Sequence, residues 1–255
     1  MSCYIKKWAL LLVFGLSGCV PASSTPTMPE ITRIGTTPSF THMVDGWLTF
    51  FNDTYPDVYI AVDVFPDKNG LEALEQGEIA TFITGNLPNE NRFITPVGID
   101  AVAVIKNPSL NVNDLNREEL RDLFTGRITD WEQLEISSGA VEVVIPLRGD
   151  AVRNKFKEII LRDDAFATGA FLGPTPSAVV ELVTSTPGAI GFLPLSFAGG
   201  EDLHIEIDGI SPTLSNVIGG KYALGFDLIA IALEEPTGDA RLFVQWVQED
   251  QFGGE

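Results

Sequence analysis

Hydrophobic and polar positions follow two different rhythms along this chain, and each rhythm is typical of one kind of element. Short apolar runs bounded by turn residues predict buried strands, whereas apolar residues three or four positions apart predict amphipathic helices. The clearest helix begins at Pro38, with Thr37 as its N-cap, and ends before Pro56. Its apolar stripe consists of Phe40, Met43, Val44, Trp47, Leu48, Phe51 and Tyr55.

Strands and helices alternate over the whole chain after Glu30. The predicted strands are residues 31–35, 59–64, 79–83, 100–105, 141–147, 189–193 and 222–233. The predicted helices are residues 38–55, 70–76, 116–124, 152–161, 177–186 and 237–248. Such alternation predicts an α/β fold with largely parallel sheets.

Residues 1–18 have the pattern of an export signal. Lys6 and Lys7 precede an apolar run of nine residues, 8–16. A membrane-spanning helix needs about twenty apolar residues, so this run is too short for a stable anchor. A basic start followed by a short apolar core predicts a secretory signal that is removed.

The end of this signal, Leu16-Ser17-Gly18-Cys19, resembles the lipobox of bacterial lipoproteins. In that family the cysteine becomes the first mature residue and its sulfur carries a diacylglycerol, because a thiolate is a strong enough nucleophile to form the thioether. The alternative is an ordinary signal with a chance cysteine. Cys3 is lost with the signal, so a mature chain has neither an internal disulfide nor a cysteine metal site.

Residues 19–29 are predicted to be the lipidated Cys19 and a flexible tether. This stretch is rich in Pro, Ser and Thr and has too little apolar surface to fold. We therefore expect an extracytoplasmic protein that lipidated Cys19 anchors to the cell membrane.

The chain is strongly acidic. Its formal net charge is -19, and loss of Lys6 and Lys7 makes it -21. A surface of this kind argues against binding to nucleic acid or to anionic lipid. Any anion bound here must be held by local donors, since the net charge repels it.

The usual signatures of catalysis are missing from the sequence. It contains no G-x-S-x-G elbow, no H-E-x-x-H and no Walker loop. His42 and His204 are the only histidines and lie far apart in the sequence, which argues against a metal site or a catalytic triad. We expect a binding protein without a cofactor or metal, not an enzyme.

Residues 35–39, Gly-Thr-Thr-Pro-Ser, join a predicted strand to a helix start. Free backbone N–H groups and the helix dipole favour an anion at such a place. The hydroxyls of Thr36, Thr37 and Ser39 add donors. The alternative is a capped helix that binds nothing.

Arg148 follows the predicted strand 141–147, and Arg153 lies in the helix after it. An arginine at the carboxyl end of a strand can hold an oxyanion through two parallel hydrogen bonds. The alternative is a surface arginine paired with Asp150.

Four segments in the right order resemble the phosphate-binding-protein family of ABC importers. They are residues 35–37, 123–131 (LFTGRITDW), 183–192 (VTSTPGAIGF) and 212–222 (PTLSNVIGGKY). The resemblance covers almost the whole chain from Ile31 on. It implies a type II periplasmic-binding-protein fold: two lobes with mixed sheets, joined by a hinge that the chain crosses twice. We place lobe 1 at residues 30–104 plus 198–255 and lobe 2 at 105–197.

The same resemblance implies three ligand loops, and two of them depart from the family pattern. In the second loop, Thr84-Gly85-Asn86 keeps a hydroxyl but lacks the charged partner usual in the family. In the third, Arg148 is kept, but residues 150–152, Asp-Ala-Val, stand where Ser-Gly-Thr is expected. The candidate ligand residues are Thr36, Thr37, Ser39, Thr84, Asn86, Arg148, Asp150 and Arg153.

The resemblance implies a monomeric binding module that closes on phosphate or another small oxyanion. An ABC permease in the membrane is the expected partner. The alternative is the same fold with an altered pocket, serving as a sensor or as a surface lipoprotein that binds another ligand or a protein partner.

Overall fold

The computed structural model describes residues 31–88, 91–136, 139–198 and 200–252. From Ile31 on, the chain forms one unit, which is described here by itself. The predicted export signal, the lipidated Cys19 and the tether lie outside the described residues.

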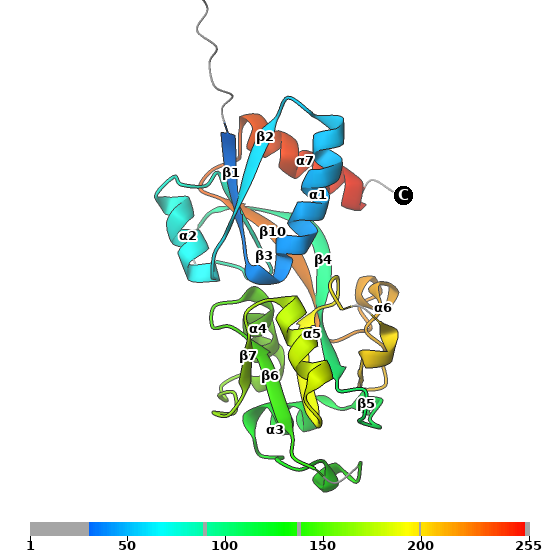
Figure 1. Cartoon of the computed structure of the whole chain (residues 1–255). Coiled ribbons are helices and arrows are strands. Elements are labelled where there is room, and N and C mark those ends of the chain that lie inside the picture. Colours follow the sequence, from blue (N-terminus) through cyan, green and yellow to red (C-terminus); the bar gives the residue numbers. More distant parts are fainter. Residues whose placement is uncertain (1–30, 89–90, 137–138, 199, 253–255) are drawn as a thin grey trace, which may run out of the picture. The chain divides into compact units, whose positions relative to one another are not determined.

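A mixed sheet of eight strands runs through this unit (Figure 1). Its strands, in spatial order, are β2 (Tyr59–Val64), β1 (Ile31–Thr36), β3 (Thr81–Thr84), β10 (Gly225–Ala232), β4 (Phe93–Lys106), β8 (Ala189–Pro194), β6 (Glu142–Pro146) and β7 (Phe171–Gly173). Two short strands, β5 (Asp114–Leu115) and β9 (Glu206–Ile207), form a separate parallel pair.

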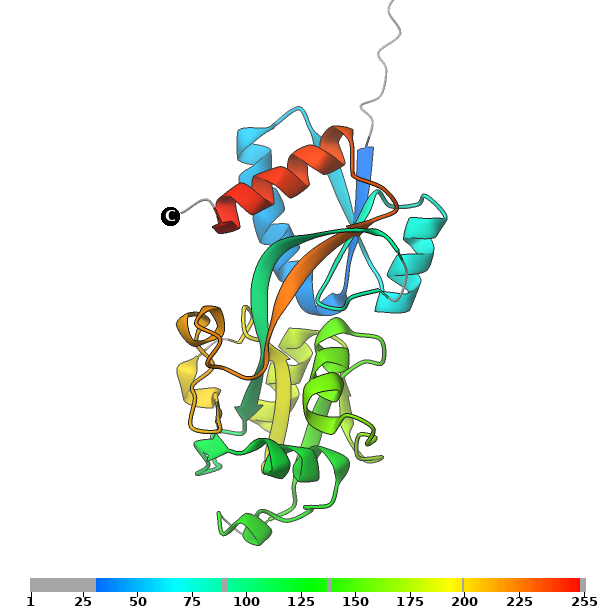
Figure 2. The same cartoon turned by 180° about the vertical axis from the view of Figure 1, so that it is seen from behind.

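Strand β4 links the two halves of this sheet. It pairs with β10 through residues 93–101 and with β8 through residues 102–106. Figure 2 shows β4 and β10 running side by side from one half into the other. The outer pairs β1–β2, β1–β3, β6–β7 and β6–β8 are parallel, whereas β10 and β4 are antiparallel to their neighbours. The sheet is therefore mixed, as the family resemblance implies, and less parallel than the alternation of elements predicts.

Helices flank each half of the sheet (Figures 1 and 2). The first half carries α1 (Thr41–Thr54), which continues from a 3-10 turn (Pro38–Phe40), α2 (Asp67–Glu75) and α7 (Gly238–Phe252). The second carries α3 (Arg117–Thr125), α4 (Ala151–Phe156) with its π-helical extension (Lys157–Leu161), α5 (Pro176–Ser185) and the short α6 (Leu214–Ile218). None of the helices in the described part of the chain is both long and apolar enough to span a membrane.

Two of the segments that carry the family resemblance, 123–131 and 183–192, contribute to the core of the second half. Phe156 and Phe192 stack with ring centroids 4.1 Å apart, and Phe124 packs against both. The buried Trp131 donates its indole N–H to the carbonyl of Gly188 at 2.9 Å. These residues stabilise the fold and identify it, and none of them is a candidate ligand residue.

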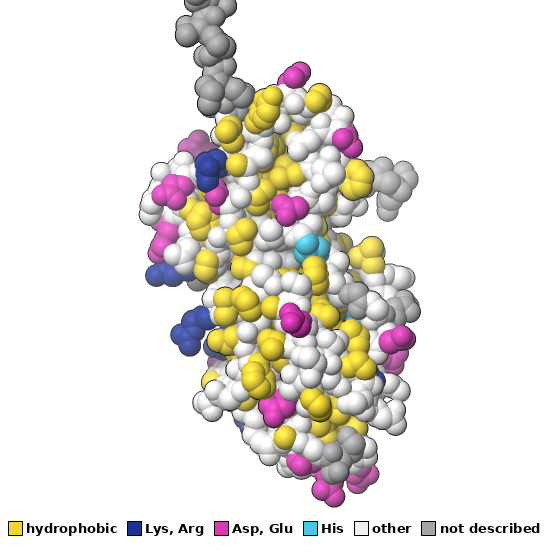
Figure 3. All heavy atoms as spheres, in the orientation of Figure 1, with side chains coloured by type: hydrophobic (Ala, Val, Ile, Leu, Met, Phe, Trp, Pro, Cys, Tyr) yellow, Lys and Arg dark blue, Asp and Glu magenta, His cyan; other side chains and the backbone are white. Residues whose placement is uncertain are grey.

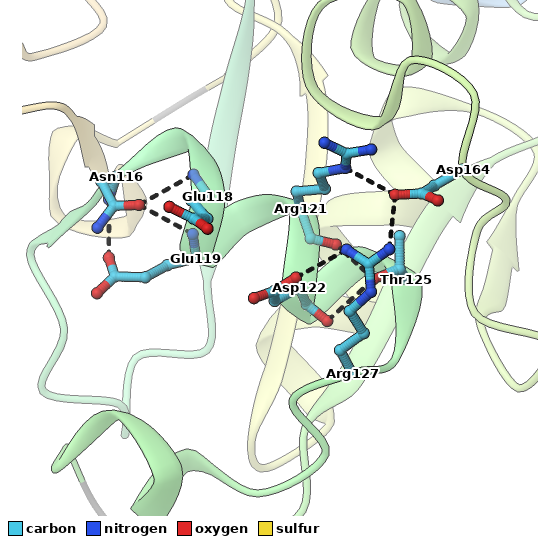
Figure 4. Close-up of polar contacts among 8 residues, drawn as sticks. All are labelled: Asn116, Glu118, Glu119, Arg121, Asp122, Thr125, Arg127 and Asp164. Carbon is cyan, nitrogen blue, oxygen red and sulfur yellow. Dashed lines mark hydrogen bonds and ion pairs between the residues drawn. The ribbon is translucent and has the colours of Figure 1, made fainter.

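Helix α3 shows how the sequence fixes one of these elements. Asn116 caps it in a reciprocal capping box with Glu119, and Gly126 ends it with a left-handed φ of 76°. Beyond that glycine, Arg127 contacts Asp122 and Asp164, and Arg121 also reaches Asp164 (Figure 4). The network ties α3 to the turn after the π-helix.

Strand β4 begins at Phe93 rather than at Asp100. The register against β10 shifts between Leu228 and Ile229, opposite Gly98 and Pro96, so Val97 forms a bulge. A bulge tolerates proline inside a sheet, where its missing N–H would break a regular ladder. The predicted strand 222–233 instead begins at Gly225, and Tyr222 lies before it with its hydroxyl bonded to the Val102 carbonyl.

Candidate functional site

Six of the eight predicted ligand residues lie in two neighbouring groups, and both groups are near the place where the first half of the fold meets the second. We call the first group the carboxylate clasp: Ser39, Asp67, Thr84, Asn86, Asp150 and Asn154. The second lines a cavity that we call the arginine cavity, and it includes Arg148 and Arg153.

Asp150 is the centre of the carboxylate clasp. Its carboxylate accepts from the Ser39 hydroxyl at 2.6 Å and from the Ser39 amide at 3.1 Å. It also caps α4, accepting from the amides of Val152 at 3.0 Å and Arg153 at 3.4 Å. The side chain is buried, and burial raises the pKa of Asp150 despite these donors, with the charge of Asp67 acting in the same direction. The donors expected to hold an external anion therefore hold a carboxylate of the protein itself.

Asp67 is the second carboxylate of the clasp; it is half-buried, and the sequence analysis does not identify it. It accepts from the Thr84 hydroxyl and from the Asn86 amide group, each at 2.6 Å, and from the Asn154 amide group at 2.8 Å. Burial raises the pKa of Asp67, and these three donors lower it in part. The signal that could have identified Asp67 in the sequence is its position directly after Pro66 at the start of a helix, since acidic residues are favoured in the first turn of a helix.

Several of these hydrogen bonds join the first half of the fold to the second. Besides Ser39–Asp150 and Asp67–Asn154, the Asp67 amide donates to the Gly149 carbonyl at 2.8 Å. The Asn86 side chain donates to the Ala151 carbonyl at 3.2 Å. The hollow beside Ser39 and Asp150 has no room for a water molecule. In this arrangement the clasp is filled by its own side chains.

Thr36 and Thr37 are fully buried in the turn before α1. The Thr36 hydroxyl donates to the Ile83 carbonyl at 3.1 Å, so it serves the packing of β1 against β3. The Thr37 hydroxyl has no hydrogen-bond partner among the described residues. Neither threonine lines the arginine cavity.

The arginine cavity has a volume of about 530 Å³ and lies at the carboxyl end of β6. Its lining comprises Ile145, Arg148, Arg153, Asn154, Lys157, Ala165, Phe166, Ala167, Thr168, Ala170 and Leu172. Three of these residues are cations and none is an acid. On the face shown in Figure 3, Lys and Arg side chains are few and gather mainly at the left edge, near the level where the two halves meet.

Arg153 is the most constrained cation of the cavity. It donates to the Pro146 carbonyl at 2.7 Å, and its guanidinium lies 4.8 Å from the centre of the Phe166 ring. Burial lowers the pKa of Arg153, and the nearby Arg148 lowers it further. Two guanidinium groups held close together are an arrangement that an oxyanion stabilises.

The structure thus brings Ser39, Thr84, Asn86 and Asp150 together, and brings Arg148 together with Arg153. It does not place Arg148 and Ser39 around one cavity, nor does it pair Arg148 with Asp150. Sequence reasoning missed Lys157 and Phe166, which become neighbours of Arg148 only through the fold. The described residues contain no cluster of three His, Cys, Asp or Glu side chains that could hold a metal ion.

The family model for the PBP superfamily domain matches residues 21–251 of this chain. Among curated proteins, the chain is similar to the phosphate-binding protein PstS of Bacillus subtilis. The two are 25% identical over 210 residues, which cover 79% of this chain and 70% of that protein. These relatives are binding proteins, and the prediction that the chain is not an enzyme is confirmed.

Solved structures with phosphate transport in their descriptions share the fold. A phosphate ABC transporter substrate-binding protein from Clostridium perfringens, with bound phosphate, aligns with a TM-score of 0.80 and 21% identity, covering 88% of this chain and 97% of that one. An ABC-type phosphate transport receptor from Vibrio cholerae aligns with a TM-score of 0.71 and 20% identity, covering 85% and 93%. At these identities the likeness shows the fold alone, and the predicted type II periplasmic-binding-protein fold is confirmed.

Proposed function

The chain belongs to the PBP superfamily, and on this premise we propose that it captures phosphate or a similar small oxyanion outside the cytoplasm for an ABC importer. It would act as a monomer, anchored to the membrane through a lipid on Cys19, and an ABC permease would recognise its closed form.

The observation that carries this proposal is the arginine cavity. In a chain with a formal charge of -19, a cavity with three cations and no acid in its described lining favours an anionic ligand. Charge-assisted hydrogen bonds contribute about 1.5–3 kcal/mol each, so several of them together support micromolar binding, which needs about 8 kcal/mol.

Thermal unfolding of the full chain, purified in detergent, tests the proposal with phosphate, sulfate, molybdate, nitrate and small organic acids. A ligand at a thousand times its dissociation constant adds about 4 kcal/mol of stability. We expect a clear rise in Tm with one oxyanion and its loss in Arg148→Ala. Arg241→Ala is the matched control, because Arg241 is an exposed arginine on α7 that pairs with Glu235. A shift that survives Arg148→Ala intact would show that the site is elsewhere.

One observation favours the alternative, a sensor or a surface lipoprotein with an altered pocket. The Ser39 donors are occupied by Asp150, so the clasp offers them to no external anion while that carboxylate stays in place. Under this alternative none of the oxyanions changes Tm.

A further inference from the structure

We propose that the arginine cavity takes an organic anion, an oxyanion head group on an apolar or aromatic body, in preference to free inorganic phosphate. This inference rests on the proposed function, because it specifies the ligand class of the same site. Four features of the cavity support it: its size, the division of its lining, the exposure of its apolar wall and the availability of its cations.

The size of the cavity exceeds what a bare tetrahedral anion needs. Its volume of about 530 Å³ lies within the range of roughly 300–1,000 Å³ that is typical of pockets for whole small molecules. A free phosphate held by the arginines would leave most of this space to water. A ligand with a body beyond its head group would fill the space and bury apolar surface as well.

The lining is divided between charge and apolar surface. Arg148, Arg153 and Lys157 supply the cations, and Thr168 supplies a neutral hydroxyl. The rest is mainly apolar, namely Ile145, Ala165, Phe166, Ala167, Ala170 and Leu172. A site for a bare oxyanion has no need of this apolar wall, whereas an organic anion contacts both parts.

The apolar wall of the cavity is partly open to water. Leu172 of β7 lines the cavity and is 53% exposed. Apolar side chains gathered beside charged ones are typical of ligand-binding surfaces, because water contact with them is unfavourable.

The cations are available to a ligand. The side chains of Arg148 and Lys157 make no hydrogen bond or ion pair with any residue that the structure describes. Arg153 uses one N–H on the Pro146 carbonyl, and Phe166 supports the face of its guanidinium. A guanidinium stacked on an aromatic ring is held flat, and it can continue that surface under a planar ligand.

Isothermal titration of the full chain in detergent tests this inference with three probes: inorganic phosphate, phenyl phosphate and benzoate. Phenol and benzylamine, which lack the anionic head, are the controls. We expect phenyl phosphate to bind at least tenfold more tightly than inorganic phosphate, and phenol and benzylamine not to bind. Arg148→Ala should weaken phenyl phosphate binding at least tenfold.

Leu172→Ser tests the apolar wall, since this exposed side chain can be replaced without opening the core. It should reduce the preference for phenyl phosphate over inorganic phosphate. The matched control is Leu233→Ser, because Leu233 is 49% exposed and lies outside the lining, after β10.

The possible outcomes separate a failure of this inference from a failure of the proposed function. Equal or tighter binding of inorganic phosphate overturns this inference and leaves the proposed function standing. If no anion binds, both fail. Tight binding of phenyl phosphate that neither Arg148→Ala nor Leu172→Ser weakens places the ligand elsewhere and also overturns the inference.

Discussion

Asp150 combines two roles in one side chain, because it caps α4 and accepts the Ser39 hydroxyl from a position 111 residues away in the sequence. Replacement by Ala removes the cap and leaves the buried Ser39 donors without an acceptor. We expect Asp150→Ala to lower the free energy of unfolding by about 2–4 kcal/mol. Urea unfolding monitored by circular dichroism measures the change. The exposed Asp163→Ala is the control, and an equally small effect of both substitutions would mean that the clasp contributes little.

Asp100 should make the protein more stable as the pH falls, whereas an aspartate with a lowered pKa would make it less stable. Burial raises its pKa from 3.8 to about 6, although Ser196 and Ala101 donate to it. Between about pH 4 and 6 the folded chain therefore binds a proton at Asp100 that the unfolded chain does not bind. Stability should rise as pH falls from 7 to about 4, by about 2 kcal/mol from this group.

The raised pKa values of Asp67 and Asp150 add to this effect with the same sign. The lowered pKa values of His42 and Asp164 have the opposite effect. Burial lowers the pKa of His42, which acts as pH falls below 6.5, whereas Asp164 acts only as pH falls below its usual value of 3.8. Urea unfolding at pH 7, 6 and 5 measures the dependence. Asp100→Asn should weaken the dependence of the free energy of unfolding on pH, whereas the exposed Asp163→Asn should leave it unchanged. Identical pH profiles for the wild type and Asp100→Asn would contradict the raised pKa of Asp100.

Within the elements, two glycines with the same backbone conformation should tolerate a side chain differently. Gly126 ends α3 with a φ of 76°, and Gly188 precedes β8 with a φ of 75°. A Cβ at Gly126 would meet the Ala167 side chain at 3.3 Å, whereas at Gly188 it would meet the Ala140 carbonyl oxygen at 2.3 Å. Gly126→Ala should cost about 1–2 kcal/mol from the left-handed backbone alone.

Gly188→Ala should cost at least about 1 kcal/mol more than Gly126→Ala, because backbone must also move. Equilibrium unfolding in urea compares the two variants with Gly46→Ala in α1, where no atom lies within 4 Å of the new Cβ. Equal losses at Gly126 and Gly188 would show that the strand after Gly188 shifts without cost.

The elements that the sequence predicts best are those with long, strong patterns, such as α1, α7 and β8. Elements of two to five residues, β5, β7, β9 and α6, carry too few positions for a period to emerge. The start of β4 is hidden for another reason: Pro96 argues against a strand, and the bulge that accommodates it depends on pairing with β10.

The sequence predicts the loops that carry the candidate site, but it does not predict how the side chains of these loops are arranged in space. The sequence places Ser39, Asp150 and Arg148 at the ends of strands and the starts of helices. The sequence does not show that the Asp150 carboxylate points to Ser39. Nor does it show that Arg148 lines the same cavity as Lys157 and Phe166. Those directions depend on how the two halves of the fold meet, which local patterns do not encode.

On the scale of the whole molecule, the halves are joined by two antiparallel strands and by the polar contacts of the clasp. Strands β4 and β10 pass between the halves, and the clasp bonds lie beside them without covalent support. Opening the clasp would return buried donors and two carboxylates to water, and an anion would reach the Ser39 donors only by displacing Asp150.

The net charge of the molecule should control how fast an anion arrives. At a formal charge of -19 the long-range field repels the ligand, whereas the arginine cavity attracts it at short range. The Debye length falls from about 30 Å at 0.01 M salt to about 8 Å at 0.15 M. This change should screen the distant acids more than cations that contact the ligand. We expect the association rate of an anionic ligand to rise several-fold over that range, and the dissociation rate to rise less. Stopped-flow fluorescence with methylumbelliferyl phosphate measures both rates, with sucrose in place of salt as the control. An association rate that falls with added salt would show that the cavity, rather than the whole molecule, sets the field that the ligand meets.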